Sequence, residues 1–190
     1  MNFNNIKSII IPEEEVYKLI CDNKIFWQKK RNFRYLKLVM NEIVDSSVST
    51  IVQLSEIEFL DNEGILFDFP TNTIVTATIE SAGGTEANPE KESPDKLIDG
   101  TTETKFCSQK WVADSYILFD LGENENIDVF RYNIWRWYTA NDTADFPERN
   151  LKTFSLYGSN DNSTWELLDS AKDYNATSEN FSLAYTGIIT

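Results

Sequence analysis

Hydrophobic and polar residues alternate with a period of two over much of the chain. Residues 116–121 and 130–134 show this alternation, which is typical of half-buried β-strands. Clusters of Gly, Asn, Asp and Ser at residues 122–126 and 158–164 separate such segments at spacings that suit antiparallel strands. No long segment follows the 3.6-residue period of a helix, and residues 95–98 fit a single helical turn. The pattern therefore predicts an all-β, antiparallel β-sandwich.

The first part of the chain has the pattern of a separate small unit. Short strands are predicted within residues 1–32, and two of them, 16–21 and 24–28, are joined by an Asp-Asn pair that suits a tight turn. A hairpin of this size buries too little surface to be stable alone, so it must dock on something. The basic residues 29–31 read as a solvated linker. The sequence thus predicts a β-hairpin attachment unit at 1–32 and a larger domain at 33–190.

Composition and charge restrict the possible partners. A chain of 190 residues that is 41% hydrophobic and 13% aromatic can bury one core together with a small appendage. Its formal net charge of -14 repels the phosphates of nucleic acids and anionic lipids. We therefore expect no nucleic-acid and no membrane partner. A neutral glycan, a cation or another protein remains compatible with the surface.

The residue types argue against an enzyme. The chain has no histidine, which removes the commonest general base and any histidine-ligated zinc. Its two cysteines, Cys21 and Cys107, are far apart and are expected to be buried thiols, not a disulfide or a metal site. There is no recognisable acid and base pair, phosphate loop or nucleophile elbow. We expect no catalytic residue.

The start of the chain shows no export signal. Residues 1–7 are polar, and the apolar run at 9–11 ends at Pro12, so neither a signal peptide nor a membrane anchor is predicted. We therefore expect the protein to be made in a cytoplasm and not to be exported by the general secretory route.

Four sequence motifs carry a family resemblance. They are residues 34–39 (RYLKLV) with 53–59 (QLSEIEF), residues 97–106 (LIDGTTETKF), residues 116–122 (YILFDLG), and residues 154–161 (FSLYGSND) with Trp165. Together they resemble the discoidin, or coagulation-factor type C, family, which includes the carbohydrate-binding modules of family 32. The resemblance implies a galactose-binding-like jelly roll that acts as a non-catalytic carbohydrate-binding module. Phe106, Tyr116 and Asn162 stand where the family usually has tryptophan, tryptophan and glycine.

The order of the motifs departs from the family. The pair at 34–59, which normally closes the domain, comes first, so we predict a complete but circularly permuted domain. In that case residues 34–39 run antiparallel beside a strand from the C-terminal third, and Glu56 approaches Asp99. The alternative is that 34–59 closes another unit and the domain lacks its last strands, which would expose two sheet edges.

The resemblance also implies a structural calcium ion at the loop of residues 96–104. Hard cations take oxygen ligands from carboxylates, hydroxyls and carbonyls. Transferred position by position, the ligands are the Lys96 carbonyl, the Asp99 carboxylate, the Thr101 carbonyl, the Thr104 hydroxyl or carbonyl, and the Glu56 carboxylate. Without calcium, the same loop would be an Asx-turn closed by local hydrogen bonds.

Sugar binding by such modules uses an aromatic ring against a pyranose and a few polar groups for its hydroxyls. The connection at 135–149 mixes aromatic, Arg, Asn and Asp residues, and the loop at 108–111 is expected at the same end of the sandwich. Trp165 is expected in the core. The alternative for Trp135 and Trp137 is that they belong to a strand and that one of them fills the core. At least one ring of Trp111, Tyr138 or Phe146 should be exposed. The predicted carbohydrate contacts are Trp111, Tyr138, Asn141 and Arg149.

Residues 6–12 (IKSIIIP) and 19–27 (LICDNKIFW) resemble the hairpin that precedes such a domain in tail and baseplate proteins of phages and phage-like particles of Gram-positive bacteria. This resemblance implies a virion or particle tail component, made in the bacterial cytoplasm. Its partners would be cell-surface or cell-wall polysaccharide and other tail or baseplate proteins, in a homo-oligomer. A structural protein whose domain only packs against its neighbours is the main alternative. A phospholipid-binding domain is disfavoured by the acidic surface.

Overall fold

The computed structural model describes residues 18–21, 24–28, 32–61, 64–79, 92–123, 125, 127–128, 134–142 and 145–189. The chain divides into two units, Met1–Arg31 and Asn32–Thr190. In the first unit, β1 (Lys18–Cys21) pairs antiparallel with β2 (Lys24–Gln28). The role of this hairpin as an attachment unit stays a prediction. No helix among the described residues is long and apolar enough to span a membrane.

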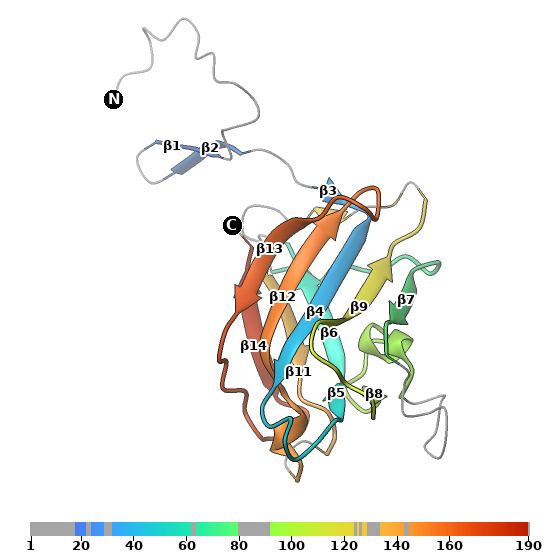
Figure 1. Cartoon of the computed structure of the whole chain (residues 1–190). Coiled ribbons are helices and arrows are strands. Elements are labelled where there is room, and N and C mark those ends of the chain that lie inside the picture. The colour runs from blue at the N-terminus through green and yellow to red at the C-terminus, as the bar shows by residue number, and fades with distance from the viewer. Residues whose placement is uncertain are drawn as a thin grey trace, which may run out of the picture. The chain divides into compact units, whose positions relative to one another are not determined.

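The second unit is built from antiparallel strands in two main sheets (Figure 1). The larger sheet has the order β13-β12-β4-β9-β7, and its strands are β4 (Tyr35–Ile43), β7 (Ile74–Ala77), β9 (Ser115–Asp120), β12 (Leu151–Ser159) and β13 (Glu166–Ala171). The smaller sheet has the order β14-β11-β6, with β6 (Glu56–Leu60), β11 (Ile134–Tyr138) and β14 (Leu183–Ile188). The predicted all-β sandwich is therefore confirmed, and its form is that of a jelly roll.

Short elements complete the second unit. The strand β5 (Val52–Leu54) pairs with β8 (Phe106–Ser108), and β3 (Asn32–Phe33) pairs with β10 (Ile127–Asp128). The 3-10 helices η3 (Pro94–Leu97) and η4 (Pro147–Arg149) lie in connections between strands. The single helical turn expected near residues 95–98 corresponds to η3.

The strand β4 shows how the sequence pattern determines the packing. Its alternation buries Leu36, Leu38 and Met40 and leaves Tyr35 and Lys37 half-buried on the opposite face. It runs antiparallel to β12 on one side and to β9 on the other. The expected pairing of residues 34–39 with a strand from the C-terminal third is therefore confirmed.

The core lies between the two sheets. Each sheet turns one apolar face inward, and every fully buried apolar side chain contributes roughly 1.5–3 kcal/mol through loss of contact with water. The rings of Phe59 and Phe119 meet edge to face with centroids 6.4 Å apart. Phe154 packs against Tyr185 at 4.9 Å. Cys107 is also buried, as predicted, and burial raises the pKa of its thiol to about 11.

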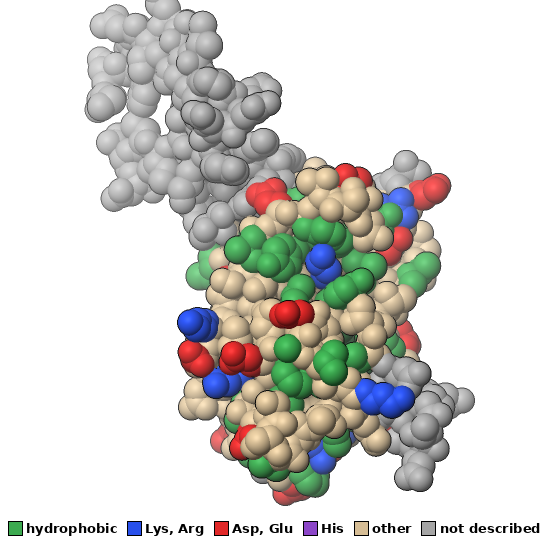
Figure 2. All heavy atoms as spheres, in the orientation of Figure 1, with side chains coloured by type: hydrophobic (Ala, Val, Ile, Leu, Met, Phe, Trp, Pro, Cys, Tyr) green, Lys and Arg blue, Asp and Glu red, His purple; other side chains and the backbone are tan. Residues whose placement is uncertain are grey.

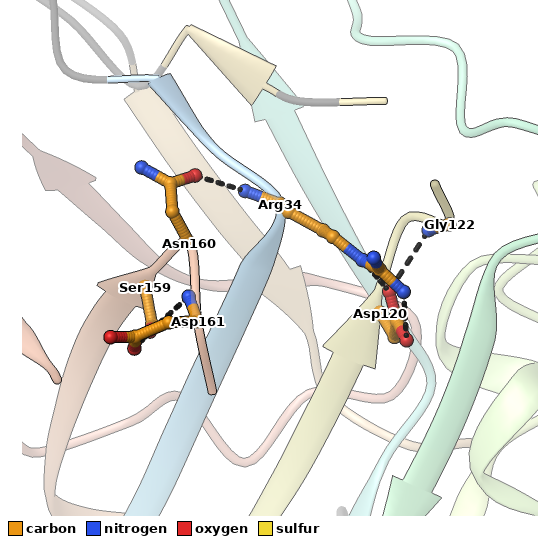
Figure 3. A network of polar contacts seen from close by, with 6 residues as sticks. All are labelled: Arg34, Asp120, Gly122, Ser159, Asn160 and Asp161. Carbon is orange, nitrogen blue, oxygen red and sulfur yellow. Dashed lines mark hydrogen bonds and ion pairs between the residues drawn. The ribbon is translucent and has the colours of Figure 1, made fainter. Parts of the chain in front are cut away.

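Polar contacts fix the start of β4 (Figure 3). The Arg34 backbone N–H donates to Asn160 Oδ1 at 3.0 Å, and its guanidinium donates to both carboxylate oxygens of Asp120 at 2.7 and 3.0 Å. Hydrogen bonding from Arg34 lowers the pKa of Asp120. In the adjacent turn, Asp161 accepts the backbone N–H groups of Ser163 and Thr164. These contacts tie β4 to both β9 and the β12–β13 turn.

Asn162, which replaces the usual turn glycine, has a φ of 55°. Asparagine tolerates this left-handed conformation better than most residues, so the turn is kept without glycine. Trp165, at the end of the same turn, is half-buried on the outer side of the larger sheet, where the Lys37 ammonium lies over its ring. The prediction that Trp165 fills the core is wrong, because the bend after the turn carries its ring onto the outer face.

Candidate functional site

The first candidate site is the loop that follows η3. Asp99 accepts hydrogen bonds from the Thr101 backbone N–H at 3.2 Å and from the Thr104 hydroxyl at 2.7 Å. The Lys96 ammonium lies 3.7 Å from the same carboxylate. Gly100 has a φ of 78°, a conformation that glycine adopts at no steric cost and that turns the chain sharply here. The loop thus gathers carboxylate, hydroxyl and carbonyl oxygens in a short segment.

Glu56 reaches this loop from the start of β6. Its Oε1 atom accepts the Gly100 backbone N–H at 3.4 Å, which confirms the predicted approach of Glu56 to the Asp99 loop. The residue is only 6% exposed, and its Oε2 atom accepts no hydrogen bond from the described residues. Desolvation, together with the nearby Asp99 and Glu58 carboxylates, raises the pKa of Glu56 to about 8. The raised pKa of Glu56 reflects burial beside other carboxylates without a positively charged partner for its own carboxyl group.

This arrangement fits a hard cation held mainly by neutral oxygens. Three of the five predicted ligand residues, Asp99, Thr101 and Thr104, lie in one hydrogen-bonded loop. Glu56 reaches this loop from β6, and the Lys96 ammonium lies beside Asp99. The described part of the chain contains no group of three or more His, Cys, Asp and Glu residues that could hold a metal. Hydroxyl and carbonyl oxygens would therefore have to complete the shell, as calcium allows. The local hydrogen bonds of Asp99 also match the Asx-turn alternative. We call this set the Glu56–Asp99 site.

A cavity of about 410 Å³ lies next to the Glu56–Asp99 site. Its lining includes Glu56, Thr101, Phe67, Tyr138 and Phe181. Tyr138, predicted as a sugar contact, is half-buried, and its hydroxyl donates to Glu58 at 3.2 Å. Tyr138 thus lies beside the candidate cation loop.

A second group of polar side chains surrounds Asp142. The Lys105 ammonium lies 2.9 Å from Asp142 Oδ2, and Arg149 Nη1 donates to the same oxygen at 3.4 Å. Lys105 is 8% exposed and also donates to Gln53 Oε1 at 3.3 Å. Glu92 lies 4.0 Å from the same ammonium. We call Gln53, Glu92, Lys105, Asp142 and Arg149 the Asp142 cluster.

Four atoms of the Asp142 cluster are buried without a hydrogen-bond partner among the described residues. They are Asp142 Oδ1, Glu92 Oε2, Arg149 Nε and Gln53 Nε2. The cluster therefore holds two unused acceptors and two unused donors. Unpaired buried polar atoms cost free energy, so these atoms need partners beyond the described side chains, and a ligand or water can supply them.

An exposed ring stands beside this cluster. The Arg149 guanidinium lies 3.6 Å from the centroid of the Phe146 ring, and Phe146 is 38% exposed. The helix η4 joins the two residues, and at its end Asn150 donates to the Thr177 carbonyl at 3.2 Å. Phe146 meets the expectation that at least one of three named rings would be exposed.

The other predicted sugar contacts fall into different places. Asn141 is exposed and directly precedes Asp142, and Arg149 is half-buried within the cluster. Trp111 is only 9% exposed, and its indole N–H donates to the Met40 carbonyl at 3.3 Å. The loop turns this indole inward against β4, so the expectation of at least one exposed ring is met by Phe146 and not by Trp111. The side chains of Trp135 and Trp137 lie outside the described residues.

Sequence reasoning missed Lys105, Gln53 and Asp142. Lys105 precedes the buried Phe106, and Gln53 lies between the buried Val52 and Leu54. A charged or amide side chain within an apolar strand segment is a signal that could have drawn attention to both, since such groups are rarely buried without a partner.

A family model, the F5/8 type C domain, matches residues 76–186, which is more than half of the chain. No curated protein and no solved structure matches the chain significantly. The match confirms the resemblance derived from the motifs, although it begins after β6. Domains of this kind bind carbohydrates or proteins and are generally non-catalytic, and the chain belongs to this F5/8 type C, or discoidin, family.

Proposed function

We propose that the second unit is a carbohydrate-binding module and that the Asp142 cluster, with Phe146, is its ligand site. One observation carries this proposal: buried, unpaired donor and acceptor atoms lie beside an exposed aromatic ring. A sugar hydroxyl both donates and accepts hydrogen bonds, so it can satisfy Asp142 Oδ1 and Arg149 Nε together. The apolar face of the pyranose would lie against the Phe146 ring.

The charges of the cluster favour a neutral sugar. Lys105 and Arg149 are balanced by Asp142 and Glu92, so the cluster has little net charge within a chain of net charge -14. An anionic group would have to displace Asp142 from both cations. Neutral hydroxyls need no such exchange, and small sites of this kind depend on a few well-placed polar groups.

Binding of the full chain to a glycan array and to purified Gram-positive cell walls tests this proposal. Phe146→Ala and Arg149→Ala should each weaken binding by about tenfold or more, because each removes a contact at the centre of the site. Phe181→Ala and Lys172→Ala are matched controls, since both residues are exposed and lie outside the cluster. Wild-type binding by both cluster variants would contradict the proposal. Absence of any glycan ligand would favour the protein-packing alternative.

A structural calcium ion at the Glu56–Asp99 site is part of the same proposal. It is supported by the orphaned Oε2 atom of the buried Glu56 and by the oxygen-rich loop beside it. Glu56, Asp99, Thr101, Thr104 and Lys96 would hold the ion. Bound calcium would neutralise the carboxylates and fix the loop, without taking part in any reaction.

Circular permutation is proposed as the origin of the unusual order of motifs. It is supported by β4, which lies between β12 and β9, while the family match begins only at residue 76. A reordered gene that places residues 33–60 after residue 189 through a short linker tests it. The reordered protein should fold with the same strand content and melt cooperatively. A reordered chain that stays unfolded, with linkers of two lengths, would contradict permutation.

The proposed setting is the tail of a phage or phage-like particle, where the module would contact host cell-wall polysaccharide and other tail proteins as a homo-oligomer. Its support is the resemblance of residues 6–12 and 19–27, most of whose structure lies outside the described residues. Antibody labelling of particles released from the producing bacterium should locate the protein on tails. Labelling of the cytoplasm alone would contradict this setting.

A further inference from the structure

The outer face of the larger sheet has an unusual composition. The face of an antiparallel sheet that looks away from the core is normally polar. Here the register places Tyr157, Lys37 and Leu118 in one row across three strands, with the 52% exposed Leu167 opposite Tyr157. Figure 2 shows hydrophobic side chains gathered around a basic one on this face. We define the aromatic face as Tyr35, Lys37, Tyr116, Tyr157, Trp165 and Leu167.

Lys37 is the charged centre of the aromatic face. Its ammonium lies 3.8 Å from the centroid of the Trp165 ring, 5.4 Å from that of Tyr116 and 5.6 Å from that of Tyr157. Within the described residues it forms no ion pair and no hydrogen bond, and partial burial lowers its pKa. Lys152, on the same sheet, lies 3.7 Å from Glu42 and 3.4 Å from Asp173. Lys37 therefore keeps a positive charge that no carboxylate of the described chain neutralises.

The rings also keep their polar atoms available. The hydroxyls of Tyr35, Tyr116 and Tyr157 and the indole N–H of Trp165 make no hydrogen bond within the described residues, although all four side chains are half-buried. A purely apolar partner would cover these donors without satisfying them, which costs free energy. A ligand rich in hydroxyls and bearing an anionic group would satisfy both the donors and the ammonium. An extended ligand also suits the face, because its rings are spread over several strands of an open sheet.

We infer that the aromatic face is a second carbohydrate-binding surface and that it takes an acidic polysaccharide, with a carboxylate of the chain paired to Lys37. This inference goes beyond the proposed function, because the aromatic face shares no residue with the Asp142 cluster. The pyranose rings lie against Trp165 and the tyrosines, and their hydroxyls bond to the phenol groups. The two surfaces thus differ in charge selectivity.

Calorimetric titration of the full chain with polygalacturonate, and with neutral galactan as the matched polymer, tests the inference. Wild type should bind polygalacturonate, and any binding of galactan should not depend on Lys37. Lys37→Met keeps the length of the side chain but removes the charge, and it should weaken polygalacturonate binding by about tenfold or more, as expected for loss of a charge-assisted contact. Lys152→Met is the control for general charge and should bind like wild type. Both variants should melt within a few degrees of wild type.

Two further variants separate this site from the Asp142 cluster. Tyr157→Phe removes only a hydroxyl and should weaken polygalacturonate binding a few-fold, while Arg149→Ala should leave it unchanged. The inference is overturned if wild type does not bind polygalacturonate or if Lys37→Met binds it like wild type. Loss of acidic-polymer binding in Arg149→Ala with retention in Lys37→Met would assign that ligand to the cluster. If Lys37→Met changes the sedimentation coefficient of the protein and wild type binds neither polymer, the aromatic face is instead a contact between copies of the chain.

Discussion

The Glu56–Asp99 site and the Asp142 cluster both contain buried polar atoms without partners, but their chemistry is opposite. The first gathers mainly oxygen atoms, with the Lys96 ammonium 3.7 Å from the Asp99 carboxylate, and its unpaired atom is an oxygen of Glu56, whose pKa is raised. The second combines two cations, two anions and an amide, and its unpaired atoms are two donors and two acceptors. An unpaired acceptor surrounded by other oxygen atoms can be satisfied by a cation. A set of unpaired donors and acceptors can be satisfied by a hydroxyl group, which both donates and accepts. The same structural sign therefore indicates an ion in one place and a neutral ligand in the other.

Calcium should separate the two sites most clearly. An ion that binds only the folded state stabilises it by about 2.7 kcal/mol at a hundredfold excess over Kd. We expect calcium to raise the melting temperature of the EDTA-treated protein, and Asp99→Ala to abolish that gain. Arg149→Ala, in the other cluster, should retain it. An equal response of wild type and Asp99→Ala in thermal unfolding would remove the difference between the sites.

Removal of a cation from the Asp142 cluster should have the next largest effect. Lys105→Met leaves Asp142 with Arg149 alone and leaves Gln53 Oε1 without its donor. Because Asp142 is partly exposed, we expect a loss of about 2 kcal/mol in the free energy of unfolding, less than for a fully buried pair. Urea unfolding measures it, with Lys172→Met as an exposed control. A loss below that of the control would show that the cluster is not held by its charges.

In the absence of metal, Glu56 should make the stability of the fold depend on pH. The folded-state pKa of Glu56 is raised from 4.5 to about 8, so the fold favours its protonated form. This contribution is fully present below pH 4.5 and is lost as the pH rises through about 8. In EDTA, the melting temperature should therefore fall over this range, and Glu56→Gln should flatten the fall. Identical profiles for the two proteins would refute the raised pKa.

Prediction from the sequence succeeded where strand pattern or motif determines position. Alternation predicted β9, the family motif at residues 34–39 predicted β4, and the match of the Ser55–Glu58 strand to the Asp99 loop predicted a contact between segments far apart in the chain. Prediction failed for aromatic residues in the loops between strands, because the alternation of inward and outward side chains does not extend into loops. Trp111, predicted as a sugar contact, is buried, and Trp165, predicted in the core, is half-buried on the outer face of the larger sheet. The Asp142 cluster was found only in part, because Gln53 and Lys105 come from strand segments remote from the loop.

The smallest change in stability should come from the ring of the Asp142 cluster. Phe146 is 38% exposed and contacts Arg149 by its face, so Phe146→Ala should cost no more than about 1 kcal/mol of folding free energy. Trp111→Ala is the reference, because loss of its buried indole should cost about 3 kcal/mol or more.

If Phe146 contacts the ligand, its loss should nevertheless weaken glycan binding by about tenfold or more. Phe181, 47% exposed beside the Glu56–Asp99 site, is the matched ring, and Phe181→Ala should change neither stability nor binding. A large loss of stability in Phe146→Ala would show that the ring serves the fold. The Asp142 cluster would then lack the aromatic contact that distinguishes a sugar site from a buried ion network.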